Sequence, residues 1–175
     1  MDDKARADNE NKENEKNTKI TFRFAKRGDC GLILRFIREL AAYERMENEV
    51  VATEEKLDEW LFEKHAAEVL FPMANGKETG FALFFTSFST FLGQAGLYLE
   101  DLYILPEHRG HGIGTAVLRE LALISAQRGY GRLEWACLDW NTPSIEFYKS
   151  LGANPMNEWT TYRLSGDNLS ELAAR

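Results

Sequence analysis

The fold of this chain is decided by residues 97–115, which read Leu97-Tyr-Leu-Glu-Asp-Leu-Tyr-Ile-Leu-Pro-Glu-His-Arg-Gly-His-Gly-Ile-Gly-Thr115. Residues 97–105 form a largely apolar run that predicts a strand. Three glycines lie in residues 109–114, and residues 113–128 have the apolar spacing of a helix. Successive glycines let backbone N–H groups converge at the positive end of a helix dipole. The stretch therefore predicts an anion cradle suited to a phosphate or pyrophosphate.

Other interpretations of this loop fit less well. No Gly-Lys-Ser/Thr triplet closes it, so it is not a P-loop, and its glycines do not follow the GxGxxG spacing of dinucleotide-binding folds. A tight turn that happens to contain three glycines is the remaining alternative.

The rest of the chain supplies alternating strand and helix patterns on both sides of this stretch. Expected strands cover residues 20–24, 67–73, 79–88, 133–138 and 159–164, and expected helices begin at Asp29, Thr53 and Thr142. An Asn75-Gly76 pair predicts the turn between two of these strands. The resulting order is β-α-α-β-β-β-α-β-α-β. It predicts an α+β fold with a mixed sheet and helices on both faces.

Composition and charge narrow the function. The chain has 175 residues, 44% of them hydrophobic, which is typical of one globular domain. Its formal net charge of -7 argues against partners such as nucleic acid or an anionic membrane surface and favours a cationic small molecule. Cys30 and Cys137 lie far apart and form no disulfide framework, which suits a reducing compartment. With no apolar stretch of membrane-spanning length and no secretory signal pattern, we expect a cytoplasmic location.

The first residues differ in kind from the remainder. Residues 1–19 are charged, rich in asparagine and free of aromatic side chains, so we expect a disordered tail. Residues 20–175 show no internal repeat and no second hydrophobic core pattern. They are expected to form a single domain.

Four blocks of the chain resemble one enzyme family in order and spacing. Arg109-x-x-Gly112-x-Gly114 is similar to the RxxGxG/A motif of the GNAT superfamily of N-acetyltransferases. The further blocks resemble its diamine acetyltransferase subfamily, which includes spermidine/spermine and thialysine N-acetyltransferases; they are Leu40-Ala-Ala-Tyr-Glu44, Tyr98-Leu-Glu-Asp101 and Asp139-Trp-Asn-Thr-Pro-Ser-Ile-Glu-Phe-Tyr-Lys149. The resemblance covers residues 20–164. It implies a GNAT-type, mostly antiparallel twisted sheet and acetyl-CoA as cosubstrate.

The resemblance also implies which residues hold acetyl-CoA. Leu102 and Ile104 would offer backbone groups to the pantetheine arm, and the loop would hold the pyrophosphate. The expected cofactor-binding residues are Leu102, Ile104, Arg109, Gly110, His111, Gly112, Ile113, Gly114, Thr115, Asn141 and Lys149. Asn141 is an equally good helix cap, and Lys149 is equally consistent with a solvated lysine.

Acetyl transfer to an amine requires a base for the amine and an acid for the leaving thiolate. By resemblance, Tyr148 is the acid and Glu100 the base, the latter acting directly or through water. By resemblance, Glu100 and Asp101 both line the amine channel. Adjacent strand residues point to opposite faces, so the two can share one role only if the strand has a bulge here. The alternatives are a structural aromatic at Tyr148 and a salt-bridged pair of acids in the strand.

The residues expected to bind the acceptor amine are also assigned by resemblance. Tyr43 and Glu44 match residues that reach the amine from a neighbouring subunit, which implies a homodimer; otherwise they simply end a helix. Trp159 would wall the amine channel or pack as a core aromatic. Phe91 stands where the spermidine enzymes have Trp, and residues 139–141 look more like the thialysine branch. These departures leave the identity of the amine open.

The histidines and cysteines have no metal-ligand spacing, so no metal is expected. The sequence thus predicts direct acetyl transfer from acetyl-CoA to a primary amine of a small di- or polyamine or a lysine analogue. Two alternatives stay open: an acetyltransferase that acts on protein or peptide amines, and a GNAT module that senses acyl-CoA or a polyamine without turnover.

Overall fold

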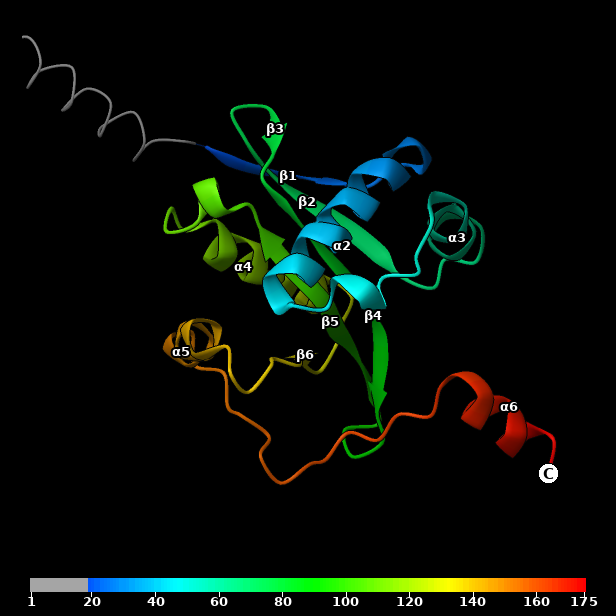
Figure 1. Cartoon of the computed structure of the whole chain (residues 1–175). Helices are drawn as coiled ribbons and strands as arrows, with labels where there is room; N and C mark the ends of the chain where they lie inside the picture. Colours follow the sequence, from blue (N-terminus) through cyan, green and yellow to red (C-terminus); the bar gives the residue numbers. More distant parts are fainter. Residues whose placement is uncertain (1–18) are drawn as a thin grey trace, which may run out of the picture. The chain divides into compact units, whose positions relative to one another are not determined.

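The structure is a computed structural model, and it describes residues 19–175 (Figure 1). The described residues form two compact units, 19–136 and 137–175, and each is described by itself. The disorder expected of residues 1–19 lies, apart from Lys19, outside the described residues. The expectation of one domain over residues 20–175 stays a prediction.

One sheet organises the first unit. Its strands follow the order β1-β2-β4-β5-β6, and β3 pairs with β2. All pairs are antiparallel except β5 with β6, which are parallel. The strands are β1 (Ile20–Phe24), β2 (Glu68–Ala74), β3 (Lys77–Glu78), β4 (Gly80–Ser89), β5 (Gln94–Ile104) and β6 (Leu133–Trp135). The mixed, mostly antiparallel sheet of the sequence prediction is confirmed.

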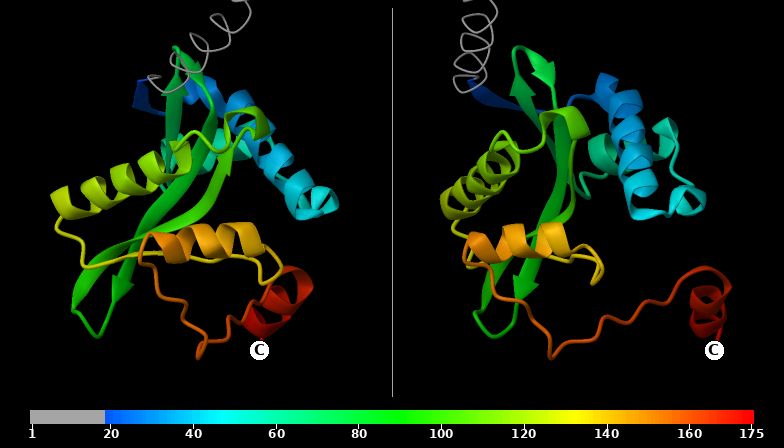
Figure 2. Two further views of the ribbon diagram at one scale, coloured as in Figure 1. Left: turned by 90° about the vertical axis from the view of Figure 1, so that its left-hand side faces the viewer. Right: turned by 60° about the vertical axis from the view of Figure 1, so that its left-hand side comes forward.

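Helices cover both faces of this sheet, as expected (Figure 2). Helix α2 (Cys30–Glu44) and helix α3 (Glu54–Leu57), which continues as a π-helical segment over Asp58–Glu63, lie on one face. Helix α4 (Ile113–Gln127) lies on the other. Short 3-10 turns occupy Arg27–Asp29, Glu47–Glu49 and Pro106–His108.

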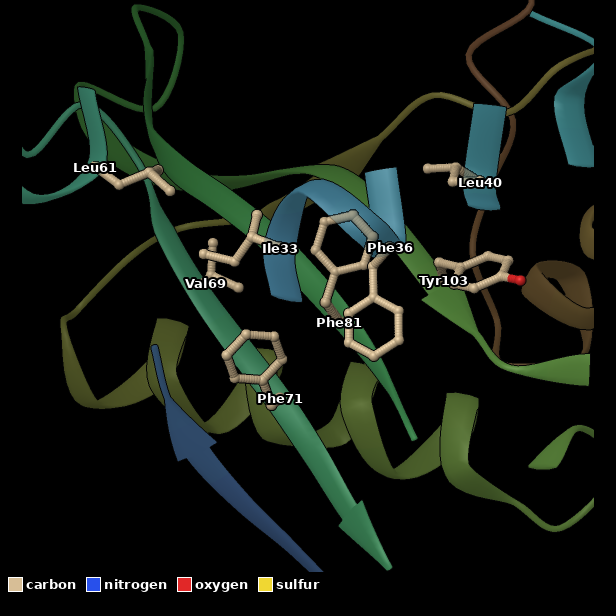
Figure 3. Close-up of a cluster of buried hydrophobic side chains, with 8 residues drawn as sticks. All are labelled: Ile33, Phe36, Leu40, Leu61, Val69, Phe71, Phe81 and Tyr103. Atoms are coloured by element: carbon tan, nitrogen blue, oxygen red, sulfur yellow. The ribbon is translucent and has the colours of Figure 1, made fainter. Parts of the chain in front are cut away.

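The apolar stripe of α2 forms the core on its face of the sheet. Phe36 is fully buried and stacks on Phe81 with ring centroids 5.8 Å apart, and Phe71 and Tyr103 lie around it (Figure 3). The cluster is completed by Ile33, Leu40, Leu61 and Val69. Burial of this stripe, repeating at helical spacing, is what holds α2 on the sheet.

The helix caps follow the sequence with one difference. Thr53 caps α3 by accepting a hydrogen bond from the Lys56 N–H at 3.3 Å. Asp29 occupies the N-cap position of α2 but makes no cap bond. Its carboxylate instead pairs with Arg23 and accepts the Lys26 N–H, because the preceding 3-10 turn turns it in that direction.

Two glycines fix the path of the central strands. Asn75 and Gly76 both have positive φ, as the predicted Asn-Gly turn requires. Gly80 opens β4 where a Cβ atom would lie 2.0 Å from the Tyr103 carbonyl oxygen. Only glycine permits β4 and β5 to approach so closely at this point.

The second unit differs most from the sequence prediction. Helix α5 (Thr142–Ser150) is confirmed. The strand expected over residues 159–164 is wrong: its residues pair with no strand in the described chain, and Trp159 and Tyr162 are 72% and 92% exposed. Alternation identifies a possible strand face but supplies no partner for its backbone groups. A short helix, α6 (Gly166–Ala173), follows instead, and the strand expected over 133–138 is limited to the three residues of β6.

Candidate functional site

The glycine loop presents free backbone donors at the start of α4. Gly112 is the N-cap, with a φ of 79°, and its carbonyl accepts the N–H of Ala116. No backbone hydrogen bond within residues 19–175 uses the N–H groups of Gly112, Ile113, Gly114 and Thr115. A Cβ built on Gly112 meets nothing within 4 Å. Open space in front of free N–H groups at the positive end of a 15-residue helix is suited to an anion.

A β-bulge lies at Glu100 in the strand that leads to this loop. Asp101 is opposite Leu83 of β4, whereas Leu99 is opposite the next residue, Phe84. Glu100 is therefore an extra residue with no partner of its own on β4. Such a residue shifts the alternation of side chains by one position.

The bulge places two carboxylates on the same face of the sheet. Tyr98 and Tyr103 lie opposite residues of β4 that are four positions apart, so both are on one face, and Tyr103 packs beneath α2. Before the bulge Glu100 alternates in phase with Tyr98, and after it Asp101 alternates in phase with Tyr103. Glu100 and Asp101 thus lie on the same face of the sheet as α2. The bulge that a shared role of the two acids requires is therefore present.

Helix α2 adds a third carboxylate to this pair. Glu44 follows Leu40 by four residues and Phe36 by eight, so it continues the buried stripe of the helix. Burial raises the pKa of Glu44. Burial, together with the negative charges of Glu100 and Glu44, raises the pKa of Asp101 to about 6. Two partly buried acids, Glu44 and Asp101, beside the exposed Glu100 form a site that favours a cation.

This charge cluster predicts that replacing Asp101 by asparagine stabilises the fold at neutral pH. The carboxyl has a pKa of about 6 in the folded protein and an ordinary value of 3.8, so the unfolded chain loses this proton first as the pH rises. The free energy of unfolding therefore falls as the pH rises from about 4 to about 6, and above that range the full destabilisation by the Asp101 charge is present. Removing the charge is expected to raise the free energy of unfolding at pH 7.5 by at most about 3 kcal/mol.

Thermal unfolding of the two proteins at pH 7.5 and pH 4 checks this result. The melting temperatures are expected to differ at pH 7.5 and to converge at pH 4. Glu49→Gln is the matched control and should change stability little, because Glu49 is exposed and is not among the charges that raise the pKa of Asp101. An Asp101→Asn protein that melts below the wild type at pH 7.5 would mean that the carboxylate is stabilised by its surroundings.

The open edge of β5 lies between the acids and the glycine loop. Strand β6 pairs only with Leu97, Tyr98 and Leu99. From Glu100 onward the edge of β5 on that side has no strand partner in the described residues. Leu102 and Ile104, the two residues expected to meet the pantetheine arm, belong to this unpaired part of the strand.

The Arg109 side chain turns away from the glycines toward the end of β5. Its Nε donates to the Ile104 carbonyl at 2.8 Å. The guanidinium carbon lies 4.8 Å from the centre of the Tyr43 ring and 5.4 Å from that of Tyr103. Arg109 thereby links the loop to both β5 and the end of α2.

The remaining site residues of the prediction lie in the second unit. Asn141 is buried and caps α5 by accepting the Ser144 N–H at 3.4 Å, so its capping role is confirmed. Tyr148 is half-buried beside Phe147, with ring centroids 5.3 Å apart. Lys149 forms an ion pair with Glu146 at 3.0 Å.

Two features of the described residues concern binding to a membrane and to a metal ion. No helix of residues 19–175 has the length and apolar character needed to cross a membrane. The same residues contain no group of three or more His, Cys, Asp or Glu side chains placed to hold a metal ion. The expectation that no metal takes part stays a prediction.

Comparison with known proteins identifies the class. The model of the acetyltransferase (GNAT) family matches residues 34–153. The chain therefore belongs to the GNAT family, and it is an N-acetyltransferase. An integron cassette protein from the mobile metagenome of V. cholerae has the same fold, with a TM-score of 0.75 and 27% identity over 89% of this chain and 98% of that one.

The curated relatives that the chain resembles include enzymes that acetylate amines. The chain is 38% identical over 170 residues to thialysine N-epsilon-acetyltransferase of Bos taurus, which covers 89% of this chain and 98% of the relative. It is 39% identical over 93 residues to L-ornithine N5-acetyltransferase of Arabidopsis thaliana, covering 53% of this chain and 41% of that protein. The resemblance to the GNAT superfamily and its diamine branch is confirmed.

Sequence reasoning missed two aspects of this site. It treated Arg109 only as part of the phosphate loop, and nothing in the spacing of the loop indicates where that side chain turns. It assigned Glu44 by resemblance, although the spacing of Phe36, Leu40 and Glu44 was a signal available in the sequence. A carboxylate on a buried helical stripe is costly and points to a function.

Proposed function

We propose that this protein transfers the acetyl group of acetyl-CoA directly to a primary amine of a small di- or polyamine or a lysine analogue. One observation carries the proposal. The bulge at Glu100 brings Glu100 and Asp101 onto the α2 face near Glu44, on the same strand that ends at an anion-binding loop. A cation site and a phosphate site are thus joined by one short length of strand.

The loop fits the pyrophosphate of acetyl-CoA. Its N–H donors from Gly112 to Thr115 have no acceptor among the described residues, and the space in front of Gly112 is open. Residues 110–115 would hold the pyrophosphate through the backbone, and the unpaired edge of β5 at Leu102 and Ile104 would hold the pantetheine arm. Asn141 and Lys149 of the second unit are proposed as further contacts of the cosubstrate.

The acidic cluster suits an amine that is an ammonium ion in solution. Glu44, Glu100 and Asp101 supply up to three negative charges, and the whole chain has a net charge of -7. Charge of this sign favours binding of a cation and raises its local concentration. Thialysine and ornithine, which the relatives' names give as substrates, are small amino acids with a side-chain amine. Tyr43 and Trp159 are proposed as walls of this amine site.

The reaction needs two proton movements by this chain. When bound, acetyl-CoA supplies the acetyl group as a thioester, whose C–S bond breaks as the amine nitrogen forms the amide bond. The Glu100 and Asp101 pair takes the first proton that the ammonium must lose before it can attack, and a carboxyl with a pKa of about 6 can do so at neutral pH. Tyr148 gives a proton to the departing sulfur, and the second proton that leaves the nitrogen as the amide forms restores the Tyr148 hydroxyl.

A homodimer is proposed because the resemblance places Tyr43 and Glu44 in a neighbouring subunit's site. In this chain both residues also lie near its own β5. The molar mass of the protein in solution, measured by light scattering, tests the dimer. The cytoplasmic location stays a prediction.

Release of the CoA thiol tests the proposed reaction. Acetyl-CoA is offered with thialysine, lysine, ornithine, putrescine, spermidine, spermine or a lysine-containing peptide. We expect turnover with at least one of the small amines and little with the peptide. The products are checked by mass for one added acetyl group.

Three results would change the proposal in different ways. Turnover of the peptide but not of the free amines would identify a protein or peptide acetyltransferase. Tight CoA binding without turnover of any amine would identify an acyl-CoA-sensing module. No binding of CoA would remove the glycine loop from the cofactor site.

A further inference from the structure

The Arg109 side chain has a fixed conformation that the loop motif does not predict. After β5 ends at Ile104, the 3-10 turn of residues 106–108 folds the chain back on itself. The Arg109 N–H bonds to the Pro106 carbonyl at 3.2 Å, and the side-chain Nε returns to the Ile104 carbonyl at 2.8 Å. Two hydrogen bonds therefore fix both the backbone and the side chain of this arginine.

This conformation places the guanidinium against two aromatic rings. Tyr103 belongs to the core beneath α2 and is 6% exposed, so it is a rigid support. Tyr43 lies in the last turn of α2, and the guanidinium carbon is 4.8 Å from its ring centre. A planar cation on an aromatic face is attracted to it, and arginine does this better than lysine because its charge is spread over a flat group.

The end of α2 is also attached by packing, because Tyr43 lies against the core cluster that contains Phe36 and Tyr103. The helix ends at Glu44, and Arg45 has left-handed φ. The last buried residues of the helix are Leu40 and Ala41, which lie just before its final turn ends. The contact with Arg109 adds a cation–aromatic attachment in the final turn of α2, and the residue that follows Tyr43 is Glu44 of the acidic cluster.

We propose that Arg109 is a positioning residue that holds the final turn of α2 against the end of β5 and so fixes Tyr43 and Glu44 for amine recognition. The proposal rests on the proposed function for its link to the amine. In this proposal the backbone N–H groups of the loop bind the phosphate, whereas the Arg109 side chain supports the amine site. Arg109 thus belongs to the phosphate loop by its position and to the amine site by its side chain.

The first test measures the attachment itself, without turnover. Hydrogen–deuterium exchange of residues 40–46 is followed in the free protein for the wild type, Arg109→Leu and Arg109→Lys. Both variants are expected to exchange about tenfold faster in this segment, because neither forms the planar stack with the Nε hydrogen bond. Arg119→Leu is the matched control, since Arg119 is an exposed arginine of α4, and it should leave the segment unchanged.

The second test is a double-mutant cycle on the amine that the wild type acetylates best. Arg109→Leu and Tyr43→Leu are each expected to raise the KM for the amine by about tenfold, and the double variant should be no worse than the poorer single one. Arg109→Lys should behave like Arg109→Leu. Rescue by lysine would show that the charge serves the phosphate instead, and it would overturn the proposal.

The two tests separate the possible failures. Unchanged exchange of residues 40–46, or additive effects of the two substitutions on the amine KM, would overturn the role of Arg109. If the wild type acetylates no amine, the proposed function fails, and the exchange experiment still decides whether Arg109 holds the helix end.

Discussion

Replacing Gly112 with glutamate is expected to abolish CoA binding while leaving the fold intact. The glutamate carboxylate would occupy the space in front of the free N–H groups of residues 112–115 and would repel the pyrophosphate. A Cβ at this position meets no neighbouring atom within 4 Å, so the substitution causes no clash. The positive φ of 79° costs a non-glycine residue about 1–2 kcal/mol, which a domain of this size tolerates. Titration calorimetry with CoA measures the loss.

Two variants separate charge from backbone strain. Gly112→Ala imposes the same φ without the carboxylate, and it should weaken CoA binding much less than glutamate does. Gly93→Glu introduces the same residue at a left-handed glycine, with a φ of 62°, in the turn between β4 and β5, and it should leave CoA affinity unchanged. Retained CoA affinity in Gly112→Glu would place the cofactor elsewhere on the molecule.

The elements around this loop were predictable because local signals agree with tertiary packing. The run of residues 97–105, the glycines and the apolar spacing of residues 113–128 each favour the observed strand, loop and α4. The Asn75-Gly76 turn and the buried stripe of α2 were equally clear. Where propensity, spacing and turn chemistry point to one structure, sequence is sufficient.

The strand expected over residues 159–164 shows where such reasoning ends. Its apolar and polar residues suggested a face to bury, but a strand forms only when a neighbour accepts and donates its backbone hydrogen bonds. Among the described residues, the one backbone N–H of residues 159–164 that is hydrogen-bonded to another backbone group is that of Trp159, which donates to the Met156 carbonyl at 3.2 Å. Pairing is a property of two segments, and the sequence of one cannot supply it.

The candidate site likewise has features that the sequence predicts and features that only the structure shows. The types of its residues were predictable, because two adjacent acids in an apolar strand are too costly without a function. The bulge at Glu100 was not, since it depends on how β5 aligns with Leu83 and Phe84 of β4. The direction of the Arg109 side chain depends on a 3-10 turn and two rings that are distant in sequence. Register and long-range contacts therefore had to come from the structure.

Replacing Tyr148 with phenylalanine is expected to lower kcat by ~10²-fold or more at unchanged acetyl-CoA affinity. The substitution removes only the hydroxyl, so the ring keeps its place beside Phe147 in α5. A hydroxyl that protonates the departing sulfur acts on the chemical step and contributes little to binding. The loss should therefore appear in kcat and in kcat/KM alike, which identifies an interaction made in the transition state.

The control is Tyr162→Phe, which removes a hydroxyl from a tyrosine of the same unit that is 92% exposed. It should retain wild-type turnover and acetyl-CoA KM. Near-normal kcat in Tyr148→Phe would remove Tyr148 from the mechanism and leave water or another donor to protonate the sulfur. A raised acetyl-CoA KM with unchanged kcat would instead assign the hydroxyl to cosubstrate binding. The division of the effect between kcat and KM thus decides which of the two roles this tyrosine has.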